Sequence, residues 1–446
     1  MRQRSGKRNH SKRVRAITPM VSAVAVLSLA FTAAPAPKAQ AAWDSFYDYH
    51  GSTSLSDIEP GTVLATRTLA YHLAGFSMPI TAVQLLFRTT DALYRPAAGV
   101  TSILLPPGGG DTTKAVAYQS FYDSLSPEHS PSRSIAGDTS LGSMVLTSET
   151  TEIAQIIARG YAVIIADTEG QQADFAAGPE YGMTTLDSIR AATHSAETDL
   201  NPDTRIGLIG YSGGAIATNW AAALAPEYAP EVNANIVGAT EGGVLVDPGH
   251  NLRYISGSVG WSGVAVMAII GIARSYEIDF TPYLSDYGIQ LRDTLAHQSI
   301  ASVLYMYPGL TWQQLVKPEY ADPNSVAPFV ATVDKINLGS APTPTIPMYI
   351  AQGANGTLEG TDGGNPTVGP GDGVMLAGDV RSLARQYCET GNPAVEYHQY
   401  DTLSHVPTLA MWTMGAAAWL DARFAGIPAG SSCGAIAPGN SLAPDL

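Results

Sequence analysis

A serine flanked by glycines lies near the middle of the chain, in the run Gly210-Tyr211-Ser212-Gly213-Gly214. A short apolar run at 205–209 precedes it and predicts a buried strand, while the small and apolar residues at 215–224 predict a helix. A sharp turn from strand to helix exposes a serine hydroxyl as a nucleophile, and the free N–H of Gly213 can stabilise an oxyanion. The pattern therefore predicts acyl transfer through Ser212.

The second requirement is a base, because a serine hydroxyl is a weak nucleophile at neutral pH. In this topology the order along the chain is serine, acid, histidine. His398 lies inside an alternating run typical of a strand, whereas His405 follows that run in a polar loop, before a helix that could begin at Pro407. A loop at the carboxyl edge of a sheet can carry an imidazole to Ser212, so we predict His405 as the base.

The acid should lie in the glycine-rich stretch from 353 to 373, which holds Glu359, Asp362 and Asp372. Asp372 directly precedes Gly373, where the next helix is predicted to begin, and such a position fixes a carboxylate firmly. We therefore favour Asp372 and keep Asp362 as the alternative. The acidic residues of this stretch match no known metal-ligand spacing, so we expect no metal ion and no cofactor.

A second oxyanion donor should come from the loop Ser120–Ser124, which follows a predicted strand at 115–119. The run Gly108–Gly110 looks like the glycine-rich oxyanion motif of esterases, but it precedes that strand and no histidine stands before it. We interpret Gly108–Gly110 as a hairpin turn.

The elements that must position these residues alternate between strand and helix. Apolar runs predict strands near 100–105, 115–119, 161–166, 206–209, 236–240, 348–351 and 395–400, and helical patterns near 149–159, 183–195 and 408–424 separate most of them. This alternation predicts an α/β fold with a mostly parallel sheet and helices on both faces. The segment 247–338 breaks the alternation and predicts a helical cap, either a mobile lid or fixed packing. The expected domains are thus a core at 42–246, the cap at 247–338 and the rest of the core at 339–446.

The first 41 residues predict a signal peptide. Basic residues at 2–15 precede an apolar stretch at 17–34, and Ala39-Gln40-Ala41 is a small-x-small cleavage site. Cleavage near Ala41 would leave a secreted protein, extracellular or associated with the cell envelope, with no stable membrane insertion. The two cysteines, Cys388 and Cys433, would then meet an oxidising compartment, which favours one disulfide.

Net charge argues against nucleic acid as a partner. The whole chain carries a formal charge of −15, and the first 41 residues hold eight basic and no acidic side chains, so the mature charge is about −23. A strongly acidic surface lacks the attraction to phosphates that drives nucleic-acid binding and would be repelled by anionic membranes. We expect a neutral lipid or ester substrate, reached at a lipid–water interface or in solution, and a monomeric protein.

Several motifs, taken together, resemble the secretory lipases of fungi and actinobacteria, the yeast lipase A type of the α/β-hydrolase superfamily. The likeness spans about residues 45–436 and rests on the elbow around Ser212, on Ser404-His405, and on two further stretches, Ala117-Tyr118-Gln119 with Asp123-Ser124, and Asp167-Thr168-Glu169-Gly170.

The resemblance implies an α/β-hydrolase with an inserted helical cap or lid that cleaves triacylglycerols or related carboxylic esters. It implies Ser212 as nucleophile, His405 as base, and Gly213 and Asp123 as oxyanion donors. An aspartate side chain donates a hydrogen bond only when protonated, so Asp123 needs a raised pKa or acts through its main-chain N–H. The acid carries over less directly, because the loop before Gly371 is longer than the family's usual connection. Cys388 and Cys433 match one family disulfide.

The prediction is therefore a triacylglycerol lipase or carboxylic ester hydrolase that acts through a Ser212-His405-Asp372 triad and an acyl-enzyme. A carboxylesterase or acyltransferase acting on cell-envelope lipids would use the same residues. A non-catalytic lipid-binding envelope protein is the alternative from another class, and the presence of Ser212, His405 and a candidate acid argues against it.

Overall fold

A computed structural model describes residues 44–361 and 368–444. The predicted signal peptide and the alternative acid Asp362 lie outside these residues. The described strands are β1 (Val63–Leu73), β2 (Phe76–Thr90), β3 (Pro96–Leu105), β4 (Lys114–Gln119), β5 (Ala162–Ala166), β6 (Arg205–Tyr211), β7 (Ile236–Gly242), β8 (Met348–Gly353) and β9 (Val395–Tyr400).

The longer helices are α3 (Thr150–Ala158), α4 (Gly178–His194), α5 (Gly213–Tyr228), α7 (Pro248–Ile255), α8 (Ser262–Ser275), α9 (Asp286–Leu295), α12 (Ala327–Lys335), α13 (Ala377–Glu389) and α14 (His405–Phe424). The short ones are α1 (Pro131–Ile135), α2 (Met144–Ser148), α6 (Pro230–Asn233), α10 (Ile300–Val303) and α11 (Trp312–Leu315). In the described part of the chain, no helix is long and apolar enough to span a bilayer.

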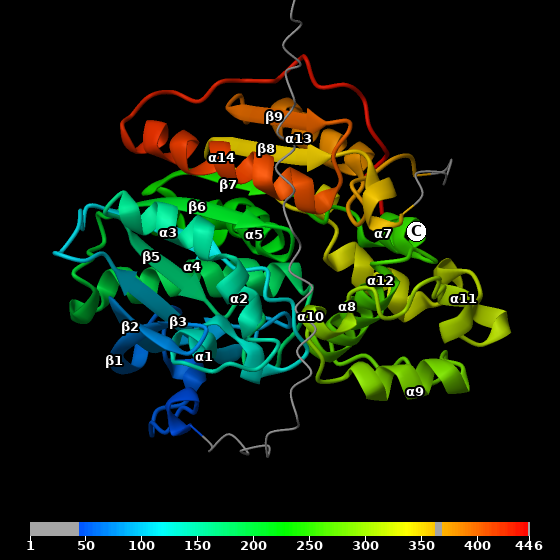
Figure 1. Cartoon of the computed structure of the whole chain (residues 1–446), viewed down its shortest axis with the longest axis horizontal. Coiled ribbons are helices and arrows are strands. Elements are labelled where there is room, and N and C mark those ends of the chain that lie inside the picture. The colour runs from blue at the N-terminus through cyan, green and yellow to red at the C-terminus, as the bar shows by residue number, and fades with distance from the viewer. Residues whose placement is uncertain (1–43, 362–367, 445–446) are drawn as a thin grey trace, which may run out of the picture. The chain divides into compact units, whose positions relative to one another are not determined.

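The nine strands form one sheet in the order β1-β2-β3-β5-β4-β6-β7-β8-β9. Strands β4 to β9 are parallel to one another, whereas β1, β2 and β3 pair as antiparallel neighbours and β3 is antiparallel to β5. The mostly parallel sheet is confirmed (Figure 1). Our sequence analysis missed β1 and β2, which extend the sheet at one edge.

Helices cover both faces of the sheet, and each face has its own core. In β4, Ala115 and Ala117 pack in one cluster with side chains of α4, α5 and α13, such as Trp220. The intervening Val116 and Tyr118 belong to a second cluster with side chains of α3 and α14. Successive strand residues point to opposite faces, so a continuous apolar run is what a strand buried on both sides requires.

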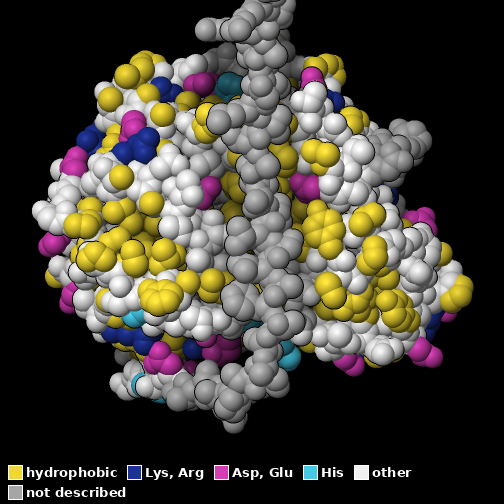
Figure 2. Space-filling view, viewed as in Figure 1, with side chains coloured by type: hydrophobic (Ala, Val, Ile, Leu, Met, Phe, Trp, Pro, Cys, Tyr) yellow, Lys and Arg dark blue, Asp and Glu magenta, His cyan; other side chains and the backbone are white. Residues whose placement is uncertain are grey.

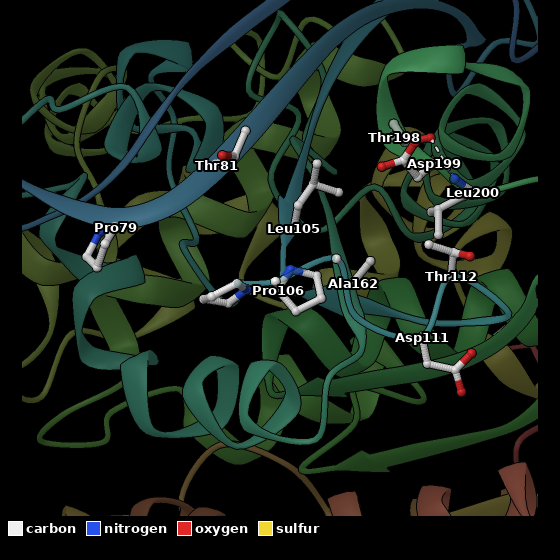
Figure 3. A pocket seen from close by; sticks show the side chains of 13 residues that line it. Pro79, Thr81, Leu105, Pro106, Asp111, Thr112, Ala162, Thr198, Asp199 and Leu200 are labelled. Atoms are coloured by element: carbon white, nitrogen blue, oxygen red, sulfur yellow. Dashed lines mark hydrogen bonds between the residues drawn. The ribbon is translucent and has the colours of Figure 1, made fainter.

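The interpretation of Gly108–Gly110 as a hairpin turn is wrong. Strand β5 lies between β3 and β4, so the connection that holds these glycines crosses the end of β5 instead of joining two paired strands. A cavity of about 240 Å³ lies beside this connection and is lined by side chains that include Pro79, Pro106 and Thr112 (Figure 3). It lies at the amino ends of β4, β5 and β6, whereas ligands of parallel sheets bind at the carboxyl ends.

The segment between β7 and β8 contains the helices α7 to α12, joined by turns, loops and short 3-10 helices. Figure 1 shows these helices gathered beside one end of the sheet. Their apolar faces pack in a third buried cluster that includes Met267, Leu295 and Trp312 and also holds core residues such as Phe175 and Met375. We call residues 247–338 the cap segment.

Candidate active site

Ser212 lies at the turn between β6 and α5, which begins at the next residue. Its backbone has φ 54° and ψ −119°, a strained conformation for a residue with a β-carbon, and its N–H donates to the carbonyl oxygen of Gly242 on β7 at 2.9 Å. A β-carbon at Gly210 or Gly214 would collide with the backbone of Gly214 or Gln119, respectively. The flanking glycines thus permit the close approach of helix and strand that this turn requires.

His405 and Asp372 are in direct contact. The Asp372 Oδ2 atom lies 2.7 Å from Nδ1 of His405, and the His405 backbone N–H donates to the Asp372 carbonyl oxygen at 2.8 Å. Oδ1 of the same carboxylate accepts from the N–H groups of Val374 at 3.1 Å and Met375 at 2.7 Å. Both side chains are buried, so this carboxylate holds the imidazole in a fixed orientation.

Two local details differ from the sequence prediction. α14 begins at His405 itself, not at Pro407, and α13 begins at Ala377, four residues later than expected. Asp372 is therefore not the cap of α13. Its carboxylate instead closes a tight turn over Val374 and Met375, which fixes it as firmly as the predicted helix cap would.

The imidazole of His405 lies among carboxylates and aromatic rings. Burial lowers the pKa of His405, but the negative charge and hydrogen bond of Asp372, together with the charge of Glu359, outweigh that effect and raise the pKa above its ordinary value. The Tyr211 hydroxyl donates to the His405 carbonyl oxygen at 2.6 Å. Because Asp372 occupies Nδ1, the other ring nitrogen is the one available to act on a hydroxyl; within the described residues that buried Nε2 has no hydrogen-bond partner.

Ser212, His405 and Asp123 line one cavity of about 160 Å³ at the carboxyl ends of the strands. Most of its other walls are apolar and come from both the core and the cap segment: Phe121, Val145, Tyr211, Trp261, Ile300, Ala301, Leu304, Val406 and Leu409. The structure thus brings together the predicted nucleophile, the predicted base and the predicted oxyanion donor. A site of this kind suits an ester with an apolar acyl chain.

Asp123 occupies a strained, buried position beside α5. Its φ is 36°, which is left-handed for a residue with a side chain, and a β-carbon at Gly213 would overlap its carboxyl group. Burial raises the pKa of Asp123 to about 8, against a smaller opposing effect of His405. The carboxyl group is therefore protonated at neutral pH and can donate a hydrogen bond.

Two buried glutamates that the sequence analysis did not assign hold the loop around Asp123. Glu149 Oε1 accepts from the hydroxyl of Ser120 and from the N–H of Phe121, both at 2.9 Å. The Glu169 carboxyl group accepts from the N–H of Ser124 at 3.1 Å. Burial raises the pKa of both glutamates well above the usual range. Glu169 lies in one of the stretches that carry the family resemblance, so the sequence could have indicated its importance.

Glu359, the third candidate acid, does not contact the imidazole by any described hydrogen bond. It is buried next to the base, where Oε1 accepts from the N–H of Val406 at 2.7 Å and Oε2 accepts from the indole N–H of Trp261 at 3.1 Å. Among the described carboxylates, Asp372 is thus the one bonded to His405.

A disulfide joins Cys388 at the end of α13 to Cys433, which follows α14. The expected pairing of the two cysteines is therefore present. It ties the C-terminal segment to the helix that follows the Asp372 turn.

Most of this chain is similar in sequence to proteins of a known family. A family model described as "Secretory lipase" matches residues 137–432. The chain is 30% identical over 393 residues to Lipase 2 of Candida albicans, an alignment that covers 85% of this chain and 80% of that relative. It is also 30% identical over 375 residues to a "probable inactive lipase" of Mycobacterium tuberculosis, covering 83% and 79% of the two chains.

Solved structures share the fold at lower identity. Candida antarctica lipase A in its closed state superposes with a TM-score of 0.77 at 23% identity over 90% of both chains. The rice cell wall degrading esterase LipA from Xanthomonas oryzae gives a TM-score of 0.60 at 14% identity and covers 82% of this chain and 98% of its own. The α/β-hydrolase fold is confirmed.

Proposed function

Because the chain belongs to the secretory lipase family, we propose that it is a secreted serine hydrolase that cleaves triacylglycerols or related carboxylic esters. One observation supports this proposal most strongly. Ser212, His405 and the buried Asp123 line the same apolar cavity, and Asp372 is hydrogen-bonded to His405. These residues come from four separate stretches of the chain, and each has the chemistry that one role in ester cleavage demands.

The proposed reaction has two halves. In the first, Ser212 Oγ attacks the ester carbonyl carbon while Nε2 of His405 takes the hydroxyl proton, and Asp372 stabilises the imidazolium that forms. The oxyanion accepts hydrogen bonds from the Gly213 N–H and the protonated Asp123 carboxyl group. The tetrahedral intermediate expels the alcohol, which receives the proton from His405, and leaves an acyl-serine. In the second half, His405 removes a proton from water, and the water oxygen attacks the carbonyl carbon of the acyl-serine. The bond to Ser212 Oγ then breaks, Oγ takes the proton from His405, and the carboxylic acid is released.

The substrate is proposed to be neutral. The chain has a formal charge of −15, and the cavity around Ser212 is lined mainly by apolar groups. Large apolar side chains that line the cavity, or lie within two residues of one that does, are also exposed: Val259, Tyr305, Met306 and Val406. In Figure 2, hydrophobic side chains gather on the surface where Figure 1 places the cap helices. Such a surface suits contact with a lipid aggregate.

The cap segment is proposed to cover the site as a distinct domain inserted between β7 and β8. Trp261, Ile300, Ala301 and Leu304 of this segment supply part of the cavity wall above Ser212. The buried cluster that includes Met267 of this segment also contains Phe175 and Met375 from outside it, so the segment packs directly on the core. Export through the N-terminal signal, with cleavage near Ala41, is part of the same proposal.

The alternative of a non-catalytic envelope protein has one observation in its favour, the relative named as a probable inactive lipase. Against it stand the intact Ser212 and the bond between His405 and Asp372.

The deciding experiment measures hydrolysis of p-nitrophenyl esters and emulsified triglyceride, together with labelling by a serine-reactive phosphonate. Wild type should do both, and Ser212→Ala should do neither while keeping its fold. Ser325→Ala changes an exposed serine of the cap segment and should behave as wild type. Phosphonate labelling that survives Ser212→Ala would refute the assignment.

A further inference from the structure

Glu359 joins the cap segment to the helix that carries the base. It ends a short 3-10 helix, Gly356–Glu359, which follows β8. One carboxylate oxygen accepts from the N–H of Val406, the residue after His405, at 2.7 Å, and the other accepts from the indole N–H of Trp261 at 3.1 Å. A buried carboxylate whose two oxygens each accept a hydrogen bond holds both donor groups in place. Loss of either hydrogen bond would leave negative charge uncompensated among apolar groups.

Trp261 is held where it contacts both the base and the substrate cavity. Its ring meets the imidazole of His405 edge-on, with centroids 5.3 Å apart and planes at 80°, and it lines the cavity above Ser212. The preceding residues are tied down as well, since the Val259 N–H donates to the Gly360 carbonyl oxygen at 3.0 Å.

A second aromatic residue of the cap segment supports the turn that contains the acid. The N–H of Gly373 donates to the hydroxyl of Tyr254 at 3.2 Å, and Thr361 donates its hydroxyl proton to the Gly373 carbonyl oxygen. The loop that carries Glu359 and the turn that carries Asp372 are therefore bonded to each other and to the start of the cap segment.

We infer that Glu359 is a positioning residue of the active site, which together with Trp261 fixes the first turn of α14 and the orientation of His405. The inference rests on the proposed hydrolase function of the same cavity. It follows that residues 254–261 of the cap segment stay docked during turnover, because their release would break the bonds of Trp261 to Glu359 and of Tyr254 to Gly373, which support the imidazole and the turn of Asp372.

The charge of Glu359 has a second effect, on the proton affinity of the base. The titratable groups around the imidazole are the carboxyl groups of Asp372, Glu359 and Asp123 and the hydroxyl of Tyr211. Tyr254 and Tyr305 lie near Glu359 and carry no charge at neutral pH, since burial raises the pKa of both. A negative charge at Glu359 stabilises the imidazolium, so its removal should lower the pKa of His405.

The first test is Glu359→Gln, assayed as kcat and KM against pH on a soluble ester. A glutamine can accept from Val406 or from Trp261 but offers its amino group to the other, so one of the two bonds is lost. We expect kcat to fall about 10-fold with KM within about 2-fold. The acidic limb of the kcat profile should move to lower pH, a change that a merely structural residue would not cause.

Glu396 offers a matched control. Its Oε1 atom accepts from the indole N–H of Trp419 at 2.8 Å and from the backbone N–H of Gly430 at 2.6 Å, the same pair of donor types. Glutamine can keep both of these bonds, so Glu396→Gln tests the loss of a carboxylate charge at a residue that lines no part of the cavity around Ser212. Glu396→Gln should leave both kcat and the acidic limb as in wild type.

Two further variants separate geometry from charge. Glu359→Asp keeps the charge but is too short to reach both donors, so kcat should fall while the acidic limb stays in place. Trp261→Phe removes the indole donor while keeping an aromatic ring, and should also lower kcat. Its control is Trp312→Phe, since the Trp312 indole donates to the Tyr320 carbonyl oxygen at 2.9 Å, within the cap segment and away from Ser212. These two variants decide the inference if Glu359→Gln does not fold.

Titration of His405, followed by NMR of histidine-labelled protein, needs no activity and separates the two proposals. A lower pKa of His405 in Glu359→Gln supports the inference even if wild type hydrolyses no ester, in which case the proposed function fails alone. An unchanged His405 pKa and an unchanged kcat in Glu359→Gln, with an active wild type, would refute the inference and leave the proposed function standing.

Discussion

Gly213 lies so close to Asp123 that a β-carbon at position 213 would overlap Oδ1 of the Asp123 carboxyl group. The main-chain N–H at the start of α5 and a buried carboxyl group are thus brought side by side, next to Ser212. Two donors in this arrangement can bind one oxyanion, provided that the carboxyl group carries a proton.

Removal of the carboxyl group should reduce turnover without unfolding the protein. We expect Asp123→Ala to lower kcat by about 100-fold, the usual cost of one oxyanion donor, with KM little changed. Hydrolysis kinetics with circular dichroism as the folding control provide the measurement. Near-normal turnover would leave main-chain groups as the only donors.

The proton on Asp123 predicts an alkaline limit to activity. Because burial raises its pKa to about 8, the neutral donor form dominates below pH 8, and above it a negative charge would face the oxyanion. The kcat of wild type should therefore decline as the pH rises through about 8. Asp123→Asn keeps a donor that does not titrate, so its profile should lack this limb. If kcat declines over the same alkaline pH range in both proteins, a group other than Asp123 causes the decline.

The pairing of His405 with Asp372 predicts which acid matters. Asp372→Asn should reduce kcat by about 10⁴-fold, because an amide favours the wrong tautomer of the imidazole and cannot stabilise its charged form. Asp362→Asn should cost far less. The reverse order of the two effects, measured as kcat on one soluble ester, would move the role of acid to Asp362.

Buried carboxyl groups predict a protein that is more stable in mild acid than in mild base. Burial raises the pKa of Asp123 and Glu241 to about 8, of Asp174 to about 7 and of Asp167 to about 6, from 3.8 for aspartate and 4.5 for glutamate. The folded chain therefore holds protons that the unfolded chain releases, and the free energy of unfolding falls as pH rises from about 4 to about 8.

Thermal unfolding at pH 5.5 and pH 8.5 checks this prediction, with the higher Tm expected at pH 5.5. Glu241→Gln removes one of these groups and replaces it with a neutral side chain of the same shape. The difference in Tm between the two pH values should shrink in that variant. A higher Tm at pH 8.5 than at pH 5.5 in wild type would contradict the sign.

Features carried by contiguous residues could be predicted from the sequence. The turn around Ser212 was recognisable because it needs a strand, a serine flanked by glycines and a helix in direct succession. All of these lie next to one another in the sequence. The position of His405 after the last strand and the choice of Asp372 followed from chain order and loop composition. The parallel sheet followed from the alternation of apolar runs with helical patterns.

Strands β1 and β2 were missed, although they pair with each other and β2 also pairs with β3. The residues of β1 are mostly half-buried, whereas β2 contains a fully buried run at 82–87, so the sequence held a signal for β2 that was not used. The start of α14 at His405 was also missed, since the backbone bond from His405 to Asp372 joins residues far apart in the sequence.

The sequence alone therefore predicted a nucleophile, a base and a preferred acid, and it determined the class of fold, since each depends on patterns that are local along the chain. The tertiary structure decided how buried carboxyl groups are placed around these residues. Asp123 beside Gly213, and Glu359 between Trp261 and Val406, are contacts across separate elements. Their chemistry arises from burial, which raises the pKa of Asp123, and burial is a property of the folded chain.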